Sequence, residues 1–420
     1  MKILVIGSGG REHSLIKHFS ESPCVSKVFV TPGNFGMKNQ AELITMNIKD
    51  HLQVVQFCQI QTIDFVFIGP EEPLVDGLAD TLRQQQIKTV GPSKLAAQLE
   101  GSKIFAKQFM KNANVATADA ETVSTVEETL KAALNHQPPF ILKADGLAAG
   151  KGVFICADLA ELKVAAENLF INKKLGDAGH KALLEKNLPG YELSLLVLTN
   201  GLSFQVLPLA QDHKRLLDNQ QGPNTGGMGT VAPLDISKTL YSKIIEKIVL
   251  PSISQLKKEK LIYRGVLFIG VMVVHDEPFA LEYNVRLGDP ETQVILPLIG
   301  NDLAVLFLHL ANGELDEINL NGKSAFCIVN AAKGYPEQAE KNTAITLPTN
   351  EEEAYVLHAA TRELNGQLVS DGGRVLNVIA VDQDYEKAKA KAYELNSKIK
   401  FEGRQFRKDL GNYQFHKSDT

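Results

Sequence analysis

Cysteine is scarce in this sequence, and its spacing argues against several kinds of site. The four cysteines, Cys24, Cys58, Cys156 and Cys327, lie far apart, form no CxxC pair and have no histidine pair nearby. The ten histidines are also scattered along the chain. This pattern argues against a zinc site and against a disulfide framework. It favours a reducing compartment, so we expect a cytoplasmic protein.

Long apolar runs and an excess of basic residues are also missing. No run of apolar residues is long enough for a membrane-spanning helix, and the N-terminal run MKILVIG is too short for a signal peptide. Lysine and arginine number 44 and acidic residues 49, and 44 − 49 gives a net charge of −5. We therefore expect no membrane and no nucleic-acid partner. A local basic pocket for a small anion remains compatible with this balance.

The composition is typical of a globular enzyme with several domains. The 420 residues, 44% hydrophobic and 22% charged, correspond to about three domains of ordinary size. Over residues 1–101, strand-like runs alternate with helical segments, which predicts a Rossmann-like domain with a parallel sheet. The predicted strands are 2–6, 27–30 and 63–68, and the predicted helices are 12–19, 52–58 and 74–86.

The remainder is predicted to form a central α+β unit at 102–320 and a small C-terminal α+β unit at 321–420. A helix over 95–112 leads into the central unit, where a glycine-rich loop at 145–152 joins two strands. Other strands are expected at 192–199, 265–274 and 279–286, and a long helix at 238–260. The C-terminal pattern predicts strands at 324–331 and 375–381 and helices at 352–364 and 385–400.

The motif GSGGREH at 7–13 stands between a predicted strand and a predicted helix. Backbone N–H groups at such a helix N-terminus can hold a phosphate. A dinucleotide fingerprint would need glycine in place of Glu12 and an acidic residue in place of Val30. A phosphate-bearing small substrate therefore fits better than NAD, and a tight turn that serves only the fold is the other alternative.

The motif DGLAAGKG at 145–152 is not a Walker A loop. Asp145 replaces its first glycine, and Gly152 replaces the Ser or Thr that would bind magnesium. A flexible glycine-rich hairpin that carries Lys151 can nevertheless fold over nucleotide phosphates. An ordinary mobile hairpin is equally compatible with this segment.

The segment LEYNVR at 281–286 carries the most informative alternation. Glu282, Asn284 and Arg286 share one face of a strand, with Leu281, Tyr283 and Val285 on the other. Carboxylate and amide oxygens suit Mg²⁺, and Arg286 can grip a carboxylate or phosphate. A strand with one solvated face is the plain alternative. The strand at 266–274 carries no charge, so we expect the polar face to line a cleft.

Other polar segments are less specific. Lys103, Lys143 and the run DHKR at 212–215 are typical of solvated surface, and GPNTGGMG at 222–229 is either a surface loop or a cover over a substrate. No serine lies in a G-x-S-x-G elbow, so a catalytic triad is not expected.

Together these motifs resemble the phosphoribosylamine–glycine ligase family of ATP-grasp enzymes. The resemblance runs nearly end to end, and GPNTGGMG followed by GDPETQ is its most specific part. The other matching motifs are GSGGREH, PGN at 32–34, GPEEPLVDG at 69–77, QLEGSK at 98–103, KADGLAAGKGV at 143–153, KGYP at 333–336, DGGRVLNV at 371–378 and FRKDLG at 406–411.

The resemblance implies the reaction of ATP, glycine and 5-phosphoribosylamine to ADP, phosphate and glycinamide ribonucleotide, through a glycyl phosphate. It implies an ATP-grasp domain with a mobile lid subdomain at about 120–190, and Mg²⁺ or Mn²⁺ on Glu282 and Asn284. The residues implied to bind ATP are Lys103, Lys143, Gly150, Lys151, Gly152, Glu185, Lys186, Leu188 and Glu192.

By the same resemblance Arg286, Asp212 and Lys214 are the catalytic residues, and a monomer is expected. The residues implied to bind the substrates are Gly9, Gly10, Asn34, Pro223, Asn224, Thr225, Gly226, Asp289 and Glu291. Leu287 and Tyr191 depart from the usual family pattern but do not touch the implied chemistry. The alternatives are another ATP-grasp carboxylate–amine ligase, a dinucleotide oxidoreductase or a binding module without catalysis.

Overall fold

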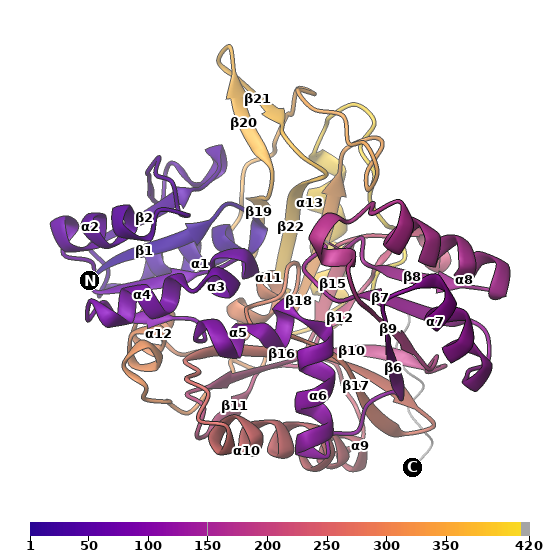
Figure 1. Cartoon of the computed structure of the whole chain (residues 1–420). Coiled ribbons are helices and arrows are strands. Elements are labelled where there is room, and N and C mark those ends of the chain that lie inside the picture. Colours follow the sequence, from indigo (N-terminus) through magenta and orange to yellow (C-terminus); the bar gives the residue numbers. More distant parts are fainter. Residues whose placement is uncertain (149, 413–420) are drawn as a thin grey trace.

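The computed structural model describes residues 1–148 and 150–412. Its N-terminal unit, drawn in indigo and violet in Figure 1, contains a parallel sheet. The sheet has five strands in the order β3-β2-β1-β4-β5. The apolar strands are buried on both faces, as expected of a parallel sheet covered by helices. The elements are β1 (Lys2–Gly7), α1 (Gly10–Glu21), β2 (Lys27–Pro32), β3 (Glu42–Leu43), α2 (His51–Gln61), β4 (Phe65–Ile68), α3 (Glu71–Asp76), α4 (Leu78–Gln84), β5 (Thr89–Val90) and α5 (Lys94–Gly101).

Two helices predicted as continuous are broken by residues that cap them. The segment at 74–86 divides at Gly77, which ends α3 in the left-handed conformation at φ +98°. The segment at 95–112 divides at Ser102, whose extended backbone and hydroxyl begin α6 (Lys103–Ala113). Both segments are helical, as predicted, but each is divided into two helices by a capping residue that was not predicted.

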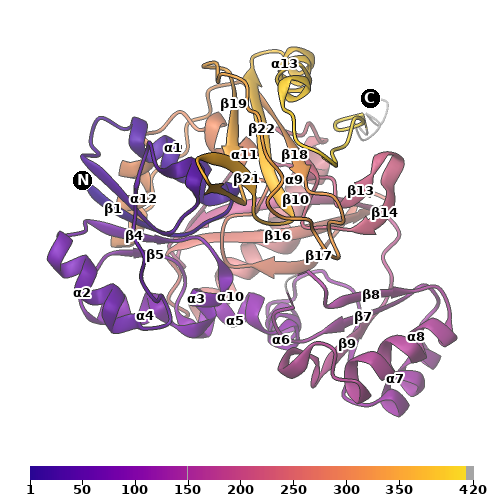
Figure 2. The same cartoon turned by 90° about the horizontal axis from the view of Figure 1, so that it is seen from above.

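A small antiparallel sheet with its own hydrophobic core occupies the region predicted as the lid subdomain, set to one side of the molecule (Figure 2). Its strand order is β6-β9-β7-β8, and the glycine-rich loop joins β7 to β8, as predicted. The elements are β6 (Ala120–Val123), α7 (Val126–Ala132), β7 (Phe140–Ala144), β8 (Val153–Cys156), α8 (Leu159–Ala166) and β9 (Ala182–Glu185).

A second antiparallel sheet, in the order β11-β10-β16-β17, forms the centre of the molecule. The helix predicted at 238–260 is present, with a π-helical turn at Ile245–Val249 between α9 and α10. The elements are β10 (Tyr191–Thr199), β11 (Phe204–Val206), α9 (Lys238–Ile244), α10 (Leu250–Lys258), β16 (Gly265–Val274), β17 (Glu277–Asn284), α11 (Thr292–Ile295) and α12 (Leu303–Asn312).

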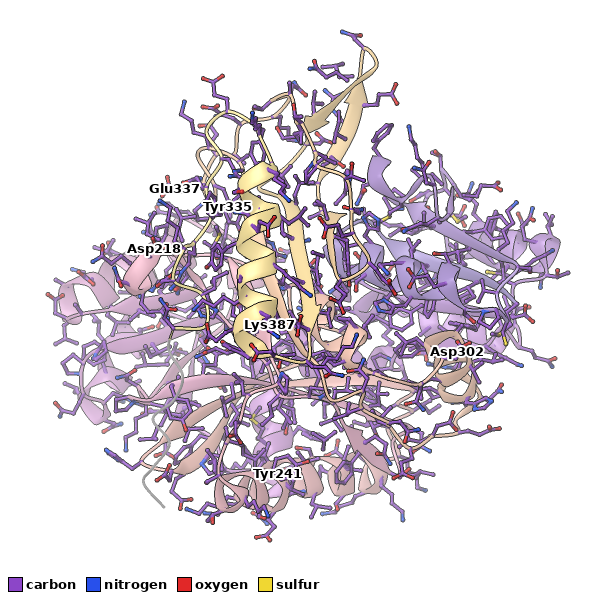
Figure 3. All side chains as sticks on the ribbon, turned by 180° about the vertical axis from the view of Figure 1, so that it is seen from behind. Asp218, Tyr241, Asp302, Tyr335, Glu337 and Lys387 are labelled. Atoms are coloured by element: carbon purple, nitrogen blue, oxygen red, sulfur yellow. The ribbon has the colours of Figure 1, made fainter. Side chains whose placement is uncertain are left out.

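The third large sheet has the order β12-β15-β18-β22-β19 and joins strands from the central and C-terminal segments. Helix α13 packs on β18 and β22, and it stands at the front of Figure 3, where Lys387 is labelled on it. The elements are β12 (Gln211–Asp212), β13 (Arg215–Leu217), β14 (Gln221–Asn224), β15 (Gly229–Ala232), β18 (Ser324–Ala331), β19 (Ala354–His358), β20 (Thr361–Leu364), β21 (Gln367–Ser370), β22 (Arg374–Asp382) and α13 (Tyr385–Lys398).

The helix predicted at 352–364 is wrong, because this segment forms strands β19 and β20. All five residues of β19 are buried, and the first four alternate between two hydrophobic cores. Pairing with β22 therefore outweighs the helix propensity of the glutamates and alanines in this segment, which becomes a strand. The loop predicted at 222–229 also differs, since it begins as strand β14.

The mixed α/β and α+β architecture predicted from the sequence is confirmed. Within the described residues, no helix is long and apolar enough to cross a bilayer.

Candidate active site

The metal-binding residues predicted on β17 lie on its polar face beside a bulge. Glu282 pairs with Gly270 of β16, and the register shifts at Leu281. The extra residue of the bulge lets Ala280 and Tyr283 both face the core. Strict alternation, which placed Leu281 on the same face as Tyr283, therefore does not hold at the bulge. The bulge sets Glu282, Asn284 and Arg286 on the polar side.

Glu282 is a carboxylate surrounded by cationic side chains. Burial raises the pKa of its carboxyl group, but Lys214, Lys143, Lys103 and Arg286 together hold it below the ordinary value. The carboxylate is therefore ionised at neutral pH and has the charge that a divalent cation requires.

Glu282 and Asn284 fit a hard divalent cation whose other ligands come from a substrate. Both contribute oxygen. Glu192, on β10 at the other edge of β16, comes within 3.5 Å of the position that a Cβ on Gly270 would occupy, as Glu282 does. Among the described residues, no group of three or more His, Cys, Asp and Glu side chains forms a metal site. Mg²⁺ commonly keeps one or two protein ligands and completes its shell with phosphate oxygens and water, which suits this pair.

The lysine predicted to bind ATP phosphates from β7 is held by a buried carboxylate. Lys143 Nζ lies 2.6 Å from Glu185 Oε2, and Lys107 Nζ lies 3.0 Å from Glu185 Oε1. Burial raises the pKa of Glu185, yet the two lysines outweigh it and leave the group ionised. Glu185 thus fixes two ammonium groups with its side chain, a role that the sequence analysis did not predict for it.

The glycine-rich loop is anchored at its base to helix α6. Asp145 Oδ1 accepts 2.8 Å hydrogen bonds from Ser102 Oγ and from the backbone N–H of Ile104. This places Lys103 beside the start of the loop. Gly150 has φ +79° with open space around it, and Lys151 is exposed. The loop therefore carries an accessible cation, as a phosphate cover would.

Leu147 of the same loop lines a pocket of about 280 Å³ on helix α3, together with Ile48, Pro73 and Val75. The loop thus reaches from the lid subdomain to the N-terminal unit. Residue 149, which lies within the predicted loop, is outside the described residues.

Two further carboxyl groups, Asp212 and Glu291, form no ion pair among the described residues, and both are influenced by Lys214, which also acts on Glu282. Burial and the charge of Glu291 raise the pKa of Asp212 well above its ordinary value, and burial raises that of Glu291. Ser194 Oγ donates to Glu291 Oε1 at 3.0 Å, whereas the buried Oδ1 of Asp212 has no hydrogen-bond partner among the described residues. Such a pair is suited to a ligand that carries an ammonium group.

Glycine is required beside this acidic pair. Gly227 has φ +111°, and a Cβ there would lie 2.5 Å from Asp212 Oδ1 and 2.6 Å from Pro290.

Lys214 is held by both its side chain and its backbone. Its Nζ forms an ion pair with Glu192, and its carbonyl accepts a 2.8 Å hydrogen bond from Thr225 Oγ1.

Arg286 is already paired with carboxylates. Its guanidinium contacts Glu100 Oε1 at 2.8 Å, Asn284 Oδ1 at 3.1 Å and Glu71 Oε2 at 3.3 Å. Burial raises the pKa of Glu100 to about 7 against the opposing charge of Arg286. The free arginine expected to grip a substrate carboxylate is therefore, in this structure, part of an ion-pair network.

The N-terminal loop faces a carboxylate of the central unit. The backbone N–H of Arg11 donates to Asp289 Oδ2 at 3.4 Å, and Arg374 binds the carbonyls of Gly226 and Asp289 at 2.5 and 2.6 Å. A Cβ on Gly10 would clash with Asn377. Asp289 thus lies against Gly9 on one side, and Arg374 joins it to Gly226 on the other.

Glu12 explains the failed dinucleotide fingerprint. Its carboxylate accepts from the backbone N–H of Gly9 at 2.7 Å and from Arg11 Nε at 2.6 Å. It also fills the space over Gly7 and Gly69, where a Cβ would meet it at 2.5 and 2.0 Å.

Some residues predicted to bind the substrates or ATP lie apart from the charged cluster, by which we mean Glu282 and the cations and carboxylates around it. Asn34 Nδ2 donates to the carbonyls of Ser8 and His358 at 2.7 and 3.0 Å, so its amide joins the N-terminal and C-terminal units. Pro223 and Asn224 are exposed on β14, Lys186 is exposed, and Leu188 is half-buried.

Four charged residues of the site were not predicted from the sequence: Lys107, Glu71, Glu100 and Arg374. Three of them lie in motifs that the sequence analysis had singled out, namely GPEEPLVDG, QLEGSK and DGGRVLNV.

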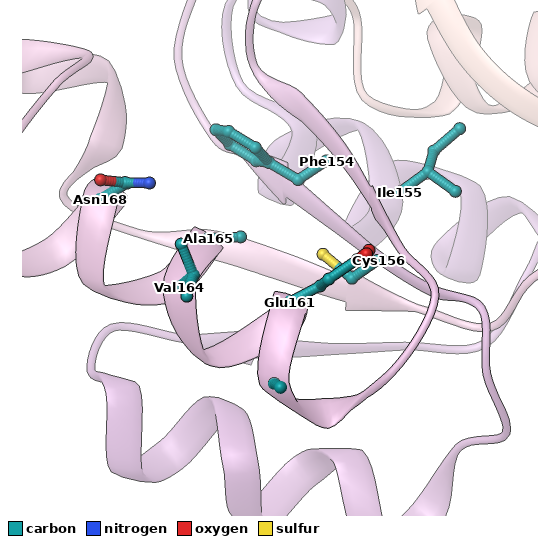
Figure 4. A pocket seen from close by; sticks show the side chains of 8 residues that line it. Phe154, Ile155, Cys156, Glu161, Val164, Ala165 and Asn168 are labelled. Carbon is teal, nitrogen blue, oxygen red and sulfur yellow. The ribbon is translucent and has the colours of Figure 1, made fainter.

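An apolar groove of about 510 Å³ lies elsewhere, on the lid between β8 and α8 (Figure 4). It is lined by Phe154, Ile155, Cys156, Val164 and neighbouring residues, with Glu161 as its charged group. Its described lining contains no cationic side chain and so does not suit phosphates. The charged residues around Glu282 are therefore the candidate active site.

Known proteins of one family match this chain over nearly its whole length. Three models of phosphoribosylglycinamide synthetase match: the N domain at residues 1–100, the ATP-grasp (A) domain at 101–292 and the C domain at 325–413. A phosphoribosylamine–glycine ligase of Agrobacterium fabrum is 41% identical over 415 residues, 98% of each chain. One of Caldanaerobacter subterraneus is 38% identical, over 98% of this chain and 99% of its own.

A solved structure of phosphoribosylamine–glycine ligase from Thermotoga maritima has the same fold. It superposes with a TM-score of 0.86 at 36% identity, covering 97% of this chain and 100% of the other.

Proposed function

Since this chain belongs to the phosphoribosylglycinamide synthetase family, we propose that it ligates glycine to 5-phosphoribosylamine in purine nucleotide biosynthesis. ATP is converted to ADP and phosphate, and the product is glycinamide ribonucleotide. The observation that carries the proposal is the adjacency of three features: an ionised Glu282 among four cations, two lysines fixed by Glu185, and the buried carboxyl pair Asp212 and Glu291. They suit a metal nucleotide and an amino acid.

The reaction needs an activated carboxylate, because a carboxylate is a poor electrophile. An oxygen of glycine attacks the γ-phosphorus of ATP, ADP leaves, and glycyl phosphate forms. The amine of phosphoribosylamine then attacks the carbonyl carbon, phosphate leaves, and the amine loses a proton. The chain supplies position and charge rather than a covalent group.

Each part of the charged cluster has a task in this scheme. Lys103, Lys143 and Lys151 bind the phosphates of ATP, with Gly150 and Gly152 in the cover. Glu185, Lys186, Leu188 and Glu192 bind the nucleoside. Glu282 and Asn284 would hold Mg²⁺ or Mn²⁺, and the cation would neutralise phosphate charge.

Asp212 and Glu291 bind the ammonium group of glycine, which supplies the cation that this carboxyl pair lacks. Lys214 and Arg286 stabilise negative charge near the reacting carboxyl group. Gly9, Gly10, Asn34, Pro223, Asn224, Thr225, Gly226 and Asp289 line the side of 5-phosphoribosylamine.

Glycyl phosphate hydrolyses in water, so the site must close during the reaction. Contact of Leu147 with the pocket on α3 supports closure of the glycine-rich loop against the N-terminal unit. All four cysteines are free thiols, which suits a reducing compartment, and we place the protein in the cytoplasm as a monomer.

Lys151→Ala is expected to raise the KM for ATP about tenfold and to leave kcat within a factor of two. An exposed ammonium on the loop binds the nucleotide about equally in the ground state and the transition state. Initial rates at varied ATP measure the effect. Lys163→Ala, on the exposed side of α8 and paired with Glu167, is the matched control. An unaltered KM in Lys151→Ala would mean that the loop is only structural.

The proposed function is tested by ADP release with ATP, Mg²⁺ and glycine, with and without phosphoribosylamine formed in place from ribose 5-phosphate and ammonia. Release that needs both substrates, with glycinamide ribonucleotide identified by mass, is the expected result. Turnover with another amino acid or amine instead would keep the ATP-grasp chemistry and overturn the substrate.

A further inference from the structure

The motif FRKDLG near the C-terminus returns to the hairpin of β13 and β14, which carries substrate residues. Arg407 is fully buried, and its Nε and Nη2 each donate to the carboxylate of Asp409 at 2.7 Å. Its remaining nitrogen, Nη1, donates to the carbonyl of Arg215 at 3.3 Å and to Gln220 Oε1 at 3.2 Å. One guanidinium therefore joins the C-terminal segment to strand β13 and to the turn of the hairpin.

The turn of this hairpin is held by the same segment. The backbone N–H of Asn219 donates to Asp409 Oδ2, and that of Lys408 donates to Asp218 Oδ1, both at 2.8 Å. Asp218 is labelled in Figure 3. Asn219 and Gln220 both have left-handed backbones, at φ +56° and +58°. Two such residues in a row are costly, and they persist where surrounding contacts fix them.

The base of the hairpin is fixed through His213. Its Nε2 accepts from the backbone N–H of Gly411 at 3.3 Å, so its Nδ1 carries the proton and donates to the carbonyl of Gly229 at 3.1 Å. Burial and the charge of Arg407 lower the pKa of His213 to about 4, so the ring is neutral. Leu410 also packs directly against Gly229.

His213 lies between Asp212 and Lys214 in the chain, and the hairpin that follows brings Thr225 back to the carbonyl of Lys214. Any displacement of the hairpin therefore moves three groups assigned to the reaction. We propose that residues 407–411 form a C-terminal clasp, in which Arg407 acts through His213 and the hairpin as a positioning residue for Asp212, Lys214 and Thr225. The effect on catalysis rests on the proposed function, whereas the effect on the hairpin does not.

The first test compares Arg407→Met with Arg404→Met in the full-length chain by hydrogen exchange and mass spectrometry. Arg404 is the matched control, since it donates to the carbonyl of Asn396 at 2.7 Å and stacks on Phe406 within the C-terminal unit. Arg407→Met is expected to speed exchange at least tenfold in peptides that cover 213–229, with little change in peptides from the lid sheet. Arg404→Met leaves both sets at the wild-type rate.

Kinetics supply the second readout. Arg407→Met is expected to lower kcat/KM for glycine and for phosphoribosylamine at least 30-fold, because small displacements of reacting groups cost about 100-fold. The fall includes a rise in the KM values for glycine and phosphoribosylamine, while the KM for ATP stays within a factor of two. A general loss of folded enzyme would instead lower the apparent kcat and leave all three KM values unchanged.

If Arg407→Met does not fold, Arg407→Lys replaces it, since lysine keeps the charge but cannot bind both oxygens of Asp409 and the hairpin together. Unchanged exchange over 213–229, or equal acceleration there and in the lid, would overturn the clasp. If the wild-type chain makes no glycinamide ribonucleotide, the proposed function fails, and hydrogen exchange still decides whether the clasp exists.

Discussion

Replacing Glu282 by glutamine is expected to lower the rate of ligation about 1000-fold, which corresponds to about 4 kcal/mol of transition-state stabilisation. The amide keeps the size of the side chain but removes its negative charge. Four cations act on that charge: Lys214, Lys143, Lys103 and Arg286. Without it the divalent cation binds weakly, and the phosphates of ATP lose part of their charge neutralisation.

The measurement is kcat/KM over a titration of Mg²⁺, together with circular dichroism to show that the fold is retained. Glu277→Gln is the matched control, because Glu277 lies on the same strand and pairs with Lys243 and Lys247 at its surface end. The control is expected to keep wild-type kinetics. Wild-type turnover and metal dependence in Glu282→Gln would remove Glu282 from the metal site.

Acid is expected to destabilise the chain through a pair of buried histidines between the N-terminal and C-terminal units. His13 Nδ1 accepts from the backbone N–H of His358 at 2.8 Å, and the two rings lie 5.6 Å apart. Burial, and for His13 the neighbouring His358, lowers the pKa of His13 to about 3, and burial lowers that of His358 to about 4.

The sign follows from proton binding. Below pH 6.5 the unfolded chain binds protons on both histidines, whereas the folded chain does not do so until the pH approaches 4. Stability therefore falls as the pH falls through this window. Between pH 6.5 and pH 5 each histidine costs about 2 kcal/mol, and the pair about 4 kcal/mol.

Urea unfolding at pH 7 and pH 5 checks this expectation in His13→Asn. The asparagine oxygen can still accept from the N–H of His358 but does not titrate, so about 2 kcal/mol of the pH dependence should disappear. His275→Asn is the control, because His275 is exposed at the β16–β17 turn, where its φ of +47° suits asparagine. An equal loss of pH dependence in both variants would mean that the buried pair is not its source.

Local patterns in the sequence were sufficient for much of the fold. Strands β1, β2 and β4 and helix α1 follow from short apolar runs bounded by glycine and charge. The placement of Glu282, Asn284 and Arg286 on one side also held, because the bulge at Leu281 comes before them. The helix predicted at 352–364 failed because its glutamate and alanine content outweighed the apolar alternation that pairs it with β22.

Partners far apart in the chain could not be predicted in this way. Glu185 as the shared partner of Lys107 and Lys143, Glu71 and Glu100 around Arg286, and Arg407 on the hairpin all join different units. Each of these residues is compatible with a solvated surface when it is read alone. Only the fold shows which charges are buried and therefore must be paired.

The sequence by itself determined the type and order of most elements, the glycine-rich loop between two strands and the motifs typical of the family, because these depend on neighbouring residues. The tertiary structure alone decided which carboxylates are neutralised and which are left for a ligand, how Asp289 meets the N-terminal loop, and how the C-terminal clasp reaches the hairpin. These features depend on burial and on contacts between distant segments, and a pattern along one chain does not contain them.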